Sequence, residues 1–358
     1  VPDTRPGSGR IPGLQDIWYE LADTIKVTPV SVSASGWLPN APEQTWTLRR
    51  GSQIDRTFLL FCELRKSGVD VDWGWQRSRN RGALAADVVA LQAFDAPVLM
   101  VAGSRSIPIK LGDELDHFLD PLDRSGGLPM LSAKSGVEYL PVPNANEHAV
   151  DRVVHLSINE NGDAEVEEEV VYTGIRAREI RSWRRSKDTD LENRVRGIVR
   201  GKFAQAEEID WEFVGDVEDD RDRKQGLRMR YRVPELVDCR ESLAVTKVPW
   251  LEFNGSSVSR ESREFAMEWS EPTDNRVSVS WDTPPGWKLL SEPEVFEDDA
   301  TGLAAVSAEL NETDSGFRYS TEYLRSTLTV TPSEYTGFRE LVERRSRLGS
   351  LYWLFTYR

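Results

Sequence analysis

The sequence predicts an α+β protein in which a helix-first region precedes a longer antiparallel β region. Apolar residues recur at helical spacing near the start of the chain. From Asp151 onward, short stretches alternate between apolar and polar residues, with turn residues between them. One helical stretch interrupts these alternating segments, and another follows them. Many short strands of this kind favour a β-sandwich behind the first domain.

The helix-first region contains two predicted helices and two predicted strands. Large apolar side chains spaced three or four residues apart predict a helix over 14–26, and a loop with Pro and Gly follows it. A second helix is expected over 57–66, because the apolar run there ends at Gly68, a helix-stop residue. Alternation over 69–75 and the apolar run 97–101 predict strands.

The β region opens with a predicted hairpin. Alternating segments at 154–158 and 166–172 flank Asn161-Gly162, a dipeptide that strongly favours a tight turn between antiparallel strands. Further strands are expected at 226–233, 265–269, 277–281 and 319–330.

Two more helices are expected within and after these strands. Thr189 and Glu192 form a capping-box pattern that predicts a helical insertion near 174–204. A last amphipathic helix over 333–358 carries Phe338 on its apolar face. The predicted domains are therefore 1–140, a β-sandwich over 147–332 that includes the insertion, and the C-terminal helix.

Composition narrows the classes of partner. The chain has 358 residues and a formal net charge of -15, so nucleic acid is an unexpected partner because its phosphates would meet a repulsive average field. Cys62 and Cys239 are too few to build a disulfide framework or a zinc cluster. No apolar run is long enough for a membrane span in this segment. Because the chain begins with Val1 rather than Met, we expect a fragment of a longer chain.

The cysteines and histidines are poorly placed for nucleophilic catalysis, which needs a thiolate at a helix start, an imidazole base and an orienting carboxylate. Cys62 is expected inside an apolar helix, in the core, and Cys239 lies in a polar stretch among the strands. His148 is expected in the linker and His155 on a strand. Only His117 lies near a candidate site.

One helix motif resembles a known family. The segment RGSQIDRTFLL at 50–60 is followed by LRKSGV at 64–69. Together they resemble the core motif of bacterial transglutaminase-like proteins, of the papain-like cysteine-enzyme superfamily, in which R-G-x-C-x-D-K precedes an apolar helix ending in L-R-x-x-G-I. Gln53 stands in the cysteine column of that motif.

Two later segments follow the same family in the same order. FDAPV at 94–98 is similar to the family's F-N-H-x-I strand, with Ala96 in the histidine column. FLDP at 118–121 is similar to its W-L-D-P, with Asp120 keeping the carboxylate. The resemblance covers essentially the whole chain and implies a degenerate transglutaminase-like α/β domain ahead of the β-sandwich.

The resemblance implies a pseudoenzyme. Gln53 and Ala96 replace the Cys and His of the family's triad, and Asp120 then has no imidazole to orient. We expect these three residues to form a degenerate site with no catalytic residue, metal or cofactor. The expected role is binding or scaffolding for a protein or peptide partner. The family also implies a bacterial, extracytoplasmic protein, periplasmic or secreted, with another β-sandwich before this domain.

A ligand groove is expected beside the degenerate site. Trp73 and Trp75 share one strand face just after the degenerate helix, and His117 is the nearest histidine. Two alternatives stay open. The first is a hydrolase or amidase with a displaced active site near Asp120 and His117, and the second is carbohydrate binding through the β-sandwich.

A basic stretch runs through the predicted insertion. Residues 175–202 contain ten basic and four acidic side chains, with Trp183 among them. Such a stretch either binds an anionic glycan or nucleic acid, or is a solvated helix face. The chain's acidic average favours the solvated face.

Overall fold

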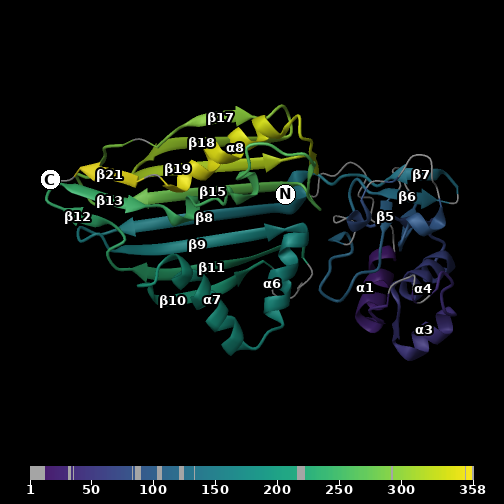
Figure 1. The fold of residues 1–358 in the computed structure, drawn as a ribbon. Coiled ribbons are helices and arrows are strands. Elements are labelled where there is room, and N and C mark those ends of the chain that lie inside the picture. The colour runs from purple at the N-terminus through teal and green to yellow at the C-terminus, as the bar shows by residue number, and fades with distance from the viewer. Residues whose placement is uncertain are drawn as a thin grey trace. The chain divides into compact units, whose positions relative to one another are not determined.

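The computed structural model describes most of the chain, and its α+β class confirms the expectation. The described residues are 13–30, 34, 36–82, 84, 90–102, 107–120, 125–132, 134–215, 222–291, 293–350 and 352–356. They belong to two compact units, Val1–Pro143 and Asn144–Arg358 (Figure 1). None of the helices in these ranges is long and apolar enough to cross a membrane.

The first unit is built on a five-stranded antiparallel sheet with strand order β5-β4-β3-β6-β7 (Figure 1). Its strands are β3 (Val71–Gln76), β4 (Ala96–Val101), β5 (Ile107–Ile109), β6 (Pro129–Ser132) and β7 (Gly136–Tyr139). Its helices are α1 (Leu14–Thr24), α3 (Pro42–Leu48) and α4 (Gln53–Lys66). Shorter elements are the parallel pair β1 (Lys26–Val27) and β2 (Arg50–Gly51), and the 3-10 turns Arg79–Arg81 and Leu91–Ala93.

Helix α4 covers one face of this sheet and packs on β3 and β4, while α1 packs against α4. Leu60 and Leu64 of α4 are fully buried with Leu99 of β4 in one apolar cluster. Trp18 of α1 joins this cluster, and its indole N–H donates to the Lys110 carbonyl oxygen at 2.8 Å. Burial of these side chains holds the helices on the sheet.

Two helix boundaries in this unit differ from the sequence prediction. Helix α4 begins at Gln53 rather than at residue 57, because Ser52 is its N-cap and forms a capping box with Asp55. The predicted loop contains helix α3, which starts with Pro42 at a position where a missing N–H costs no hydrogen bond. The polar residues ahead of the apolar run are therefore helical.

The second unit contains an eight-stranded sheet with order β10-β11-β9-β8-β15-β19-β18-β17 (Figure 1). Its strands are β8 (Ala149–Ile158), β9 (Ala164–Thr173), β10 (Glu207–Val214), β11 (Lys224–Val233), β15 (Thr273–Asp282), β17 (Phe296–Asp299), β18 (Ala304–Thr313) and β19 (Gly316–Arg325). Neighbours are antiparallel except β8 and β15, which pair in parallel at the centre. The predicted β8–β9 hairpin is confirmed. Its Gly162 has a φ of 86°, and an added Cβ would lie 2.1 Å from the Val237 carbonyl oxygen, so only glycine fits.

A smaller sheet packs on one face of the large sheet and completes a sandwich. Its strands, in the order β12-β13-β21-β16, are β12 (Asp238–Arg240), β13 (Leu243–Lys247), β21 (Tyr352–Thr356) and β16 (Lys288–Leu289). Trp281 of β15 stacks on Trp353 of β21 with ring centroids 5.4 Å apart, and Phe317 of β19 stacks on both. A separate pair joins β14 (Met267–Glu268) and β20 (Thr329–Val330).

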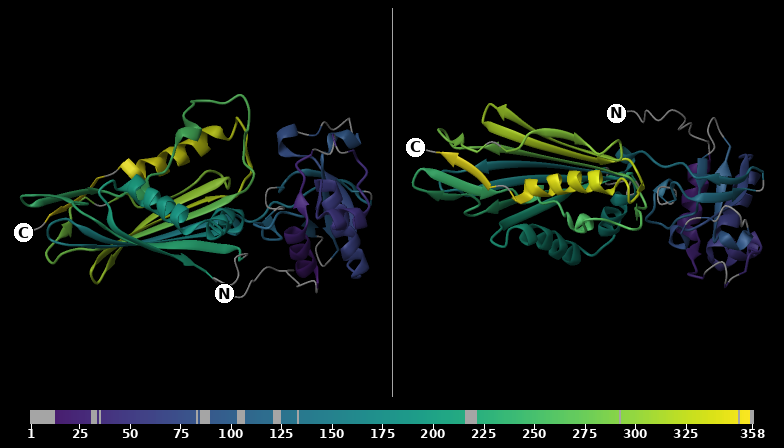
Figure 2. Two further views of the ribbon diagram at one scale, coloured as in Figure 1. Left: turned by 90° about the horizontal axis from the view of Figure 1, so that it is seen from below. Right: turned by 45° about the horizontal axis from the view of Figure 1, so that its top comes forward.

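Three helices lie on that same face of the large sheet (Figure 2). They are α6 (Ala177–Arg184), α7 (Asp188–Lys202) and α8 (Tyr335–Arg347), and short 3-10 turns lie at Ala145–His148, Gly174–Arg176, Pro249–Leu251, Ser256–Val258 and Leu348–Ser350. Helices α6 and α7 occupy the predicted insertion, but the predicted capping box is wrong because the N-cap of α7 is Lys187, so Thr189 lies inside the helix. The last helix ends at Arg347, since the aromatic segment Tyr352–Thr356 pairs with β13 as a strand.

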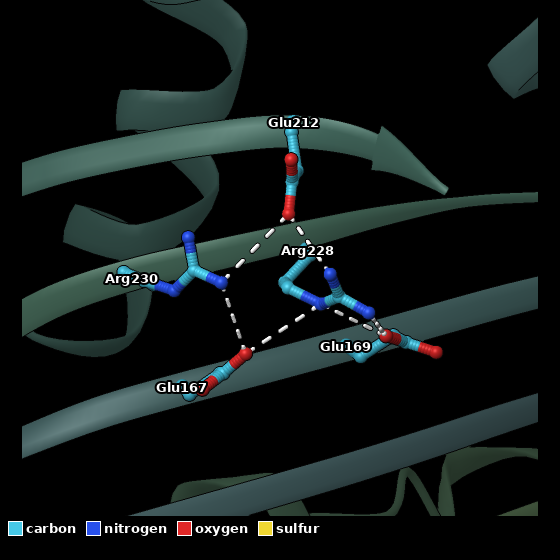
Figure 3. Close-up of polar contacts among 5 residues, drawn as sticks. All are labelled: Glu167, Glu169, Glu212, Arg228 and Arg230. Atoms are coloured by element: carbon cyan, nitrogen blue, oxygen red, sulfur yellow. Dashed lines mark hydrogen bonds and ion pairs between the residues drawn. The ribbon is translucent and has the colours of Figure 1, made fainter. Parts of the chain in front are cut away.

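The other face of the large sheet, here called the open face, carries a lattice of ion pairs (Figure 3). Arg228 of β11 lies between Glu169 of β9 and Glu212 of β10, with N–O distances of 2.7 and 2.9 Å. Arg230 and Glu167 extend the lattice with a distance of 3.3 Å. Within the described strands, no open-face position holds a Phe, Tyr or Trp side chain. The row of aromatic side chains expected of a carbohydrate-binding sheet is therefore missing from this face.

One carboxylate lies inside the core under the insertion. Glu168 of β9 has no exposed surface and accepts hydrogen bonds from Lys202 at 2.6 and 2.7 Å, from Tyr231 at 2.8 Å and from the Trp250 indole at 2.9 Å. Arg152 donates a further bond to it. Burial alone would raise the pKa of Glu168, but the charges of Lys202 and Arg152 outweigh burial and hold the pKa below its ordinary value. The charge is thus fully compensated.

Candidate functional site

The start of helix α4 is fixed by one carboxylate. Asp55 accepts hydrogen bonds from the Ser52 N–H at 2.8 Å, the Ser52 hydroxyl at 2.7 Å and the Asn40 N–H at 2.7 Å. Burial raises the pKa of Asp55, but these hydrogen bonds outweigh burial and hold the pKa below its ordinary value of 3.8. The Ser52 hydroxyl thus donates to a carboxylate that caps the helix, which is a structural role.

Gln53, which the resemblance places in the cysteine column, is the first residue of α4. Its side-chain N–H donates to the Leu111 carbonyl oxygen at 3.0 Å. Leu111 follows β5, and Ile109 lies opposite Leu99, so the chain beyond β5 runs back toward the start of β4. The Gln53 amide is therefore tied to backbone at the end of the sheet where β4 begins.

Ala96, in the histidine column, is the first residue of β4 and pairs with Gln76. Strand alternation places Ala96 on the same face as Val98, which packs with Met130 and Leu140. The neighbouring Leu99 belongs instead to the cluster under α4. Gln53 is thus joined to the segment after β5, whereas the Ala96 side chain lies on the sheet face opposite α4.

Asp120 and His117 are joined in one tight turn. The His117 N–H donates to the Asp120 carboxylate at 3.0 Å, and the Asp120 N–H donates to the His117 carbonyl oxygen at 2.9 Å. The His117 ring nitrogen Nδ1 accepts a bond from the Leu119 N–H at 3.3 Å. Asp120 is buried and holds the turn, while Pro121 of the matched motif lies outside the described residues. That Gln53, Ala96 and Asp120 form one degenerate site stays a prediction.

Arg56 is a buried charge near the helix start that the sequence analysis missed. It lies one turn beyond Ser52 and donates to the Gly112 carbonyl oxygen. Burial lowers the pKa of Arg56 to about 10, although the carboxylates of Asp113 and Asp116 favour its charged form. The sequence could have drawn attention to Arg56, because this residue occupies the position of the basic residue that ends the matched R-G-x-C-x-D-K motif.

An aromatic pocket lies on the side of α4 that faces β3. It has a volume of about 250 Å³ and is lined by Trp37, Pro39, Phe58, Phe61, Trp73 and Trp75. Trp37 and Trp75 have ring centroids 4.8 Å apart, and Trp73 contacts Phe58 and Phe61 edge to face. Such contacts hold the rings in fixed orientations.

Of the three residues expected in the ligand groove, two line this pocket and one does not. Trp73 and Trp75 are brought together in it. His117 is absent from its walls and lies against Tyr19 and Phe118 instead, with ring centroids 6.3 and 4.8 Å away. Phe58 and Phe61 were missed as lining residues, although their spacing on a helix places both on one side.

Both thiols are half-buried, so the expectation that Cys62 lies fully in the core is wrong. Cys62 lies on α4 next to Phe61, which packs against the apolar cluster of the first unit. Burial raises the pKa of the Cys62 thiol, although the charge of Lys66 opposes this, and burial also raises the pKa of Cys239. Raised thiol pKa values lower the fraction of nucleophilic thiolate.

Four of the ten basic side chains in 175–202 have the following partners within the second unit. These pairs are Arg181 with the Asp222 carbonyl oxygen, Arg184 with the Val214 carbonyl oxygen, Arg196 with Glu192, and Lys202 with Glu168. These four side chains are therefore engaged within the protein.

We expect Asp55→Asn to destabilise the first unit by about 1–3 kcal/mol, because an amide cannot accept all the hydrogen bonds that the carboxylate accepts. The folded pKa of Asp55 is lowered, so its stabilisation is present above pH 3.8 and is lost as pH falls through the folded pKa. Urea unfolding at pH 7 and at pH 3 checks this, since the wild type and the variant should converge at the lower pH. Asp70→Asn, at an exposed position, is the control. Equal destabilisation at both pH values would contradict the role of the charge.

Comparison with known proteins adds one finding about the fold. No family model matches the sequence, and no curated protein matches it. A solved structure from Parabacteroides distasonis, named a "putative protease", superposes with a TM-score of 0.57 at 11% identity. The match covers 96% of this chain and 50% of that protein, so this chain spans about half its length. At that identity, the similarity establishes that the two chains share an α+β fold.

Proposed function

We propose that this chain is a non-catalytic pseudo-transglutaminase that binds or scaffolds a peptide or protein segment. The observation that carries the proposal is at Gln53, where the family's nucleophile position holds an amide bonded to the Leu111 carbonyl oxygen. An amide does not act as a nucleophile, and here it joins the helix start to the chain beyond β5. Residue 53 therefore has a structural role in this chain, in which its side chain connects helix α4 to the segment after β5.

The aromatic pocket supports a binding role for the same helix. Phe58 and Phe61 lie one to two turns beyond Gln53 on α4, and Trp75 lies opposite them on β3. A volume of about 250 Å³ is suited to one large apolar side chain of a bound segment. Rings already packed on one another lose little freedom when such a side chain enters.

The experiment combines a binding series with an acylation assay. Blocked, glycine-flanked peptides that differ only in a central Phe, Leu, Pro, Asp or Lys are titrated by ligand-observed NMR. We expect the apolar members to bind and Trp75→Ala to weaken them about tenfold or more, because it removes a pocket wall. Trp211→Ala, in the other unit, is the matched control. Equal binding of Asp and Phe peptides, or equal effects of both variants, would contradict the proposal.

A hydrolase with a displaced site near Asp120 and His117 is the second candidate. The turn that holds these two residues together, in which the His117 backbone N–H donates to the Asp120 carboxylate, and the name of the Parabacteroides distasonis protein favour it. With p-nitrophenyl acetate, the pseudoenzyme proposal predicts no burst and no stoichiometrically acylated residue, and Cys62→Ala controls for slow thiol acetylation. A burst that His117→Ala abolishes would establish the hydrolase instead.

A further inference from the structure

A second pocket lies wholly within the second unit, under the helical insertion. It has a volume of about 470 Å³. Its walls are Tyr172, Arg176, Glu179, Trp183, Arg194 and two isoleucines, contributed by β9, the turn Gly174–Arg176, α6 and α7. A cavity of this size accommodates a small organic ligand.

The walls of this pocket belong to packed elements. Ile180 and Trp183 of α6 are 2% and 6% exposed, and Val195 and Val199 of α7 are fully buried in the same cluster. Lys202, at the end of α7, is bonded to the buried Glu168. The pocket is therefore formed before a ligand arrives, which reduces the entropy lost on binding.

Two arginines line the pocket and differ from Arg196 and Lys202 of the insertion, which pair with Glu192 and Glu168. Among the described residues, neither Arg176 nor Arg194 forms an ion pair with a carboxylate. Arg176 donates one bond to the Thr273 hydroxyl at 3.0 Å, and its Nε is buried without a hydrogen-bond partner there. The Arg194 guanidinium lies over the Trp183 ring, 5.0 Å from its centroid. Both guanidiniums thus keep N–H groups for a ligand.

The charges of the walls select the kind of ligand. Two guanidiniums face one carboxylate, that of Glu179, so the pocket is positive in a chain with a net charge of -15. The pocket walls carry a net charge of about +1, which one negative charge neutralises, whereas a dianion would leave the occupied pocket negative. The half-buried side chains of Tyr172 and Ile198, with the small exposed part of the Trp183 indole, offer apolar surface to the rest of the ligand.

We propose that this pocket binds a small organic monocarboxylate with an apolar body. Arg176 and Arg194 hold the carboxylate, because the planar guanidinium matches its two oxygens. Tyr172 and Ile198 contact the apolar body beside Trp183, and Glu179 accepts a bond from any donor that the ligand carries. This inference is independent of the function proposed for the first unit.

The test compares 3-phenylpropanoate with 3-phenylpropanamide, which has the same shape without the charge. By saturation-transfer NMR, we expect the acid to bind with a Kd on the order of 1 mM and the amide to bind at least about tenfold more weakly. Arg194→Gln should weaken the acid by about tenfold and leave the amide unchanged. Arg196→Gln is the matched control, because Arg196 lies on the same helix but pairs with Glu192.

Several results would overturn the proposal. Equal affinities of acid and amide would exclude recognition of charge, and equal effects of Arg194→Gln and Arg196→Gln would exclude this pocket. Displacement of the acid by inorganic phosphate at lower concentration would exclude selection for a monoanion. Arg176→Gln, with its fold checked by circular dichroism, should also weaken binding of the acid, and unchanged binding by this variant would contradict the proposal. No saturation transfer to the acid at roughly ten times the expected Kd would also refute it.

Discussion

Glu168→Gln is expected to destabilise the second unit by about 3–5 kcal/mol. The substitution keeps the shape of the side chain but leaves the charges of Lys202 and Arg152, which are mostly withdrawn from water, without their counter-charge. Burial already lowers the pKa of Lys202 to about 8, although Glu168 favours its charged form, so removing that carboxylate leaves the ammonium poorly supported. Urea unfolding followed by tryptophan fluorescence measures the loss.

Glu167→Gln is the matched control for this experiment. Glu167 is the neighbouring residue on β9, but it lies on the open face in the ion-pair lattice with Arg228 and Arg230 (Figure 3). Exposed pairs contribute about 0–1 kcal/mol, so the control should change little. The double variant Glu168→Gln/Lys202→Met should recover part of the loss, because it removes one unpaired charge. A loss no larger than that of the control would show that the charge of Glu168 does not stabilise the second unit.

Trp281→Ala is expected to cost about 3–5 kcal/mol in the same unit. Trp281 has no exposed surface and lies between the two sheets, where its ring stacks on Trp353 and Phe317. Truncation removes the ring on which both neighbours stack, and the sheets cannot close the cavity without moving their strands. Loss of near-ultraviolet circular dichroism, together with a lower urea midpoint, is the expected result.

Trp211→Ala serves as the comparison for Trp281→Ala. Trp211 is half-buried on the edge strand β10, where it contacts Phe213. Its loss should cost about 1–2 kcal/mol, because less apolar surface returns to water. If both variants lose the same stability, the stack between the sheets contributes no more than an edge contact.

The sequence predicted those helices and strands whose formation depends on residues close together in the chain. The hairpin around Asn161-Gly162 follows from turn chemistry and alternation, and both are visible within a few residues. The strand at Tyr352–Thr356 was missed because its partner, β13, lies about a hundred residues earlier in the chain. The helical pattern before this strand led the predicted C-terminal helix to be extended through it. Pairing with β13 makes the segment a strand instead.

The same limit applies to the sites. Alternation places Glu168 on the face of Val166 and Val170, so a buried carboxylate could have been suspected. Its partners Lys202, Tyr231 and Trp250 lie 34, 63 and 82 residues away, and no local pattern connects them. In the aromatic pocket, Trp73 and Trp75 followed from strand alternation. The position of Trp37 in the pocket could not be predicted from the sequence, because Trp37 lies in an irregular segment with no periodic pattern.

The parallel pairing of β8 with β15 has a consequence for how the large sheet folds. On either side of that pair, β8 to β11 and β15 to β19 form two antiparallel halves built from contacts that are nearer in sequence. The seam joins Ala149 to Asp274, and closing so long a loop costs entropy that short hairpins do not pay. We therefore expect each half to form before the seam, and the formation of the seam to limit the folding rate.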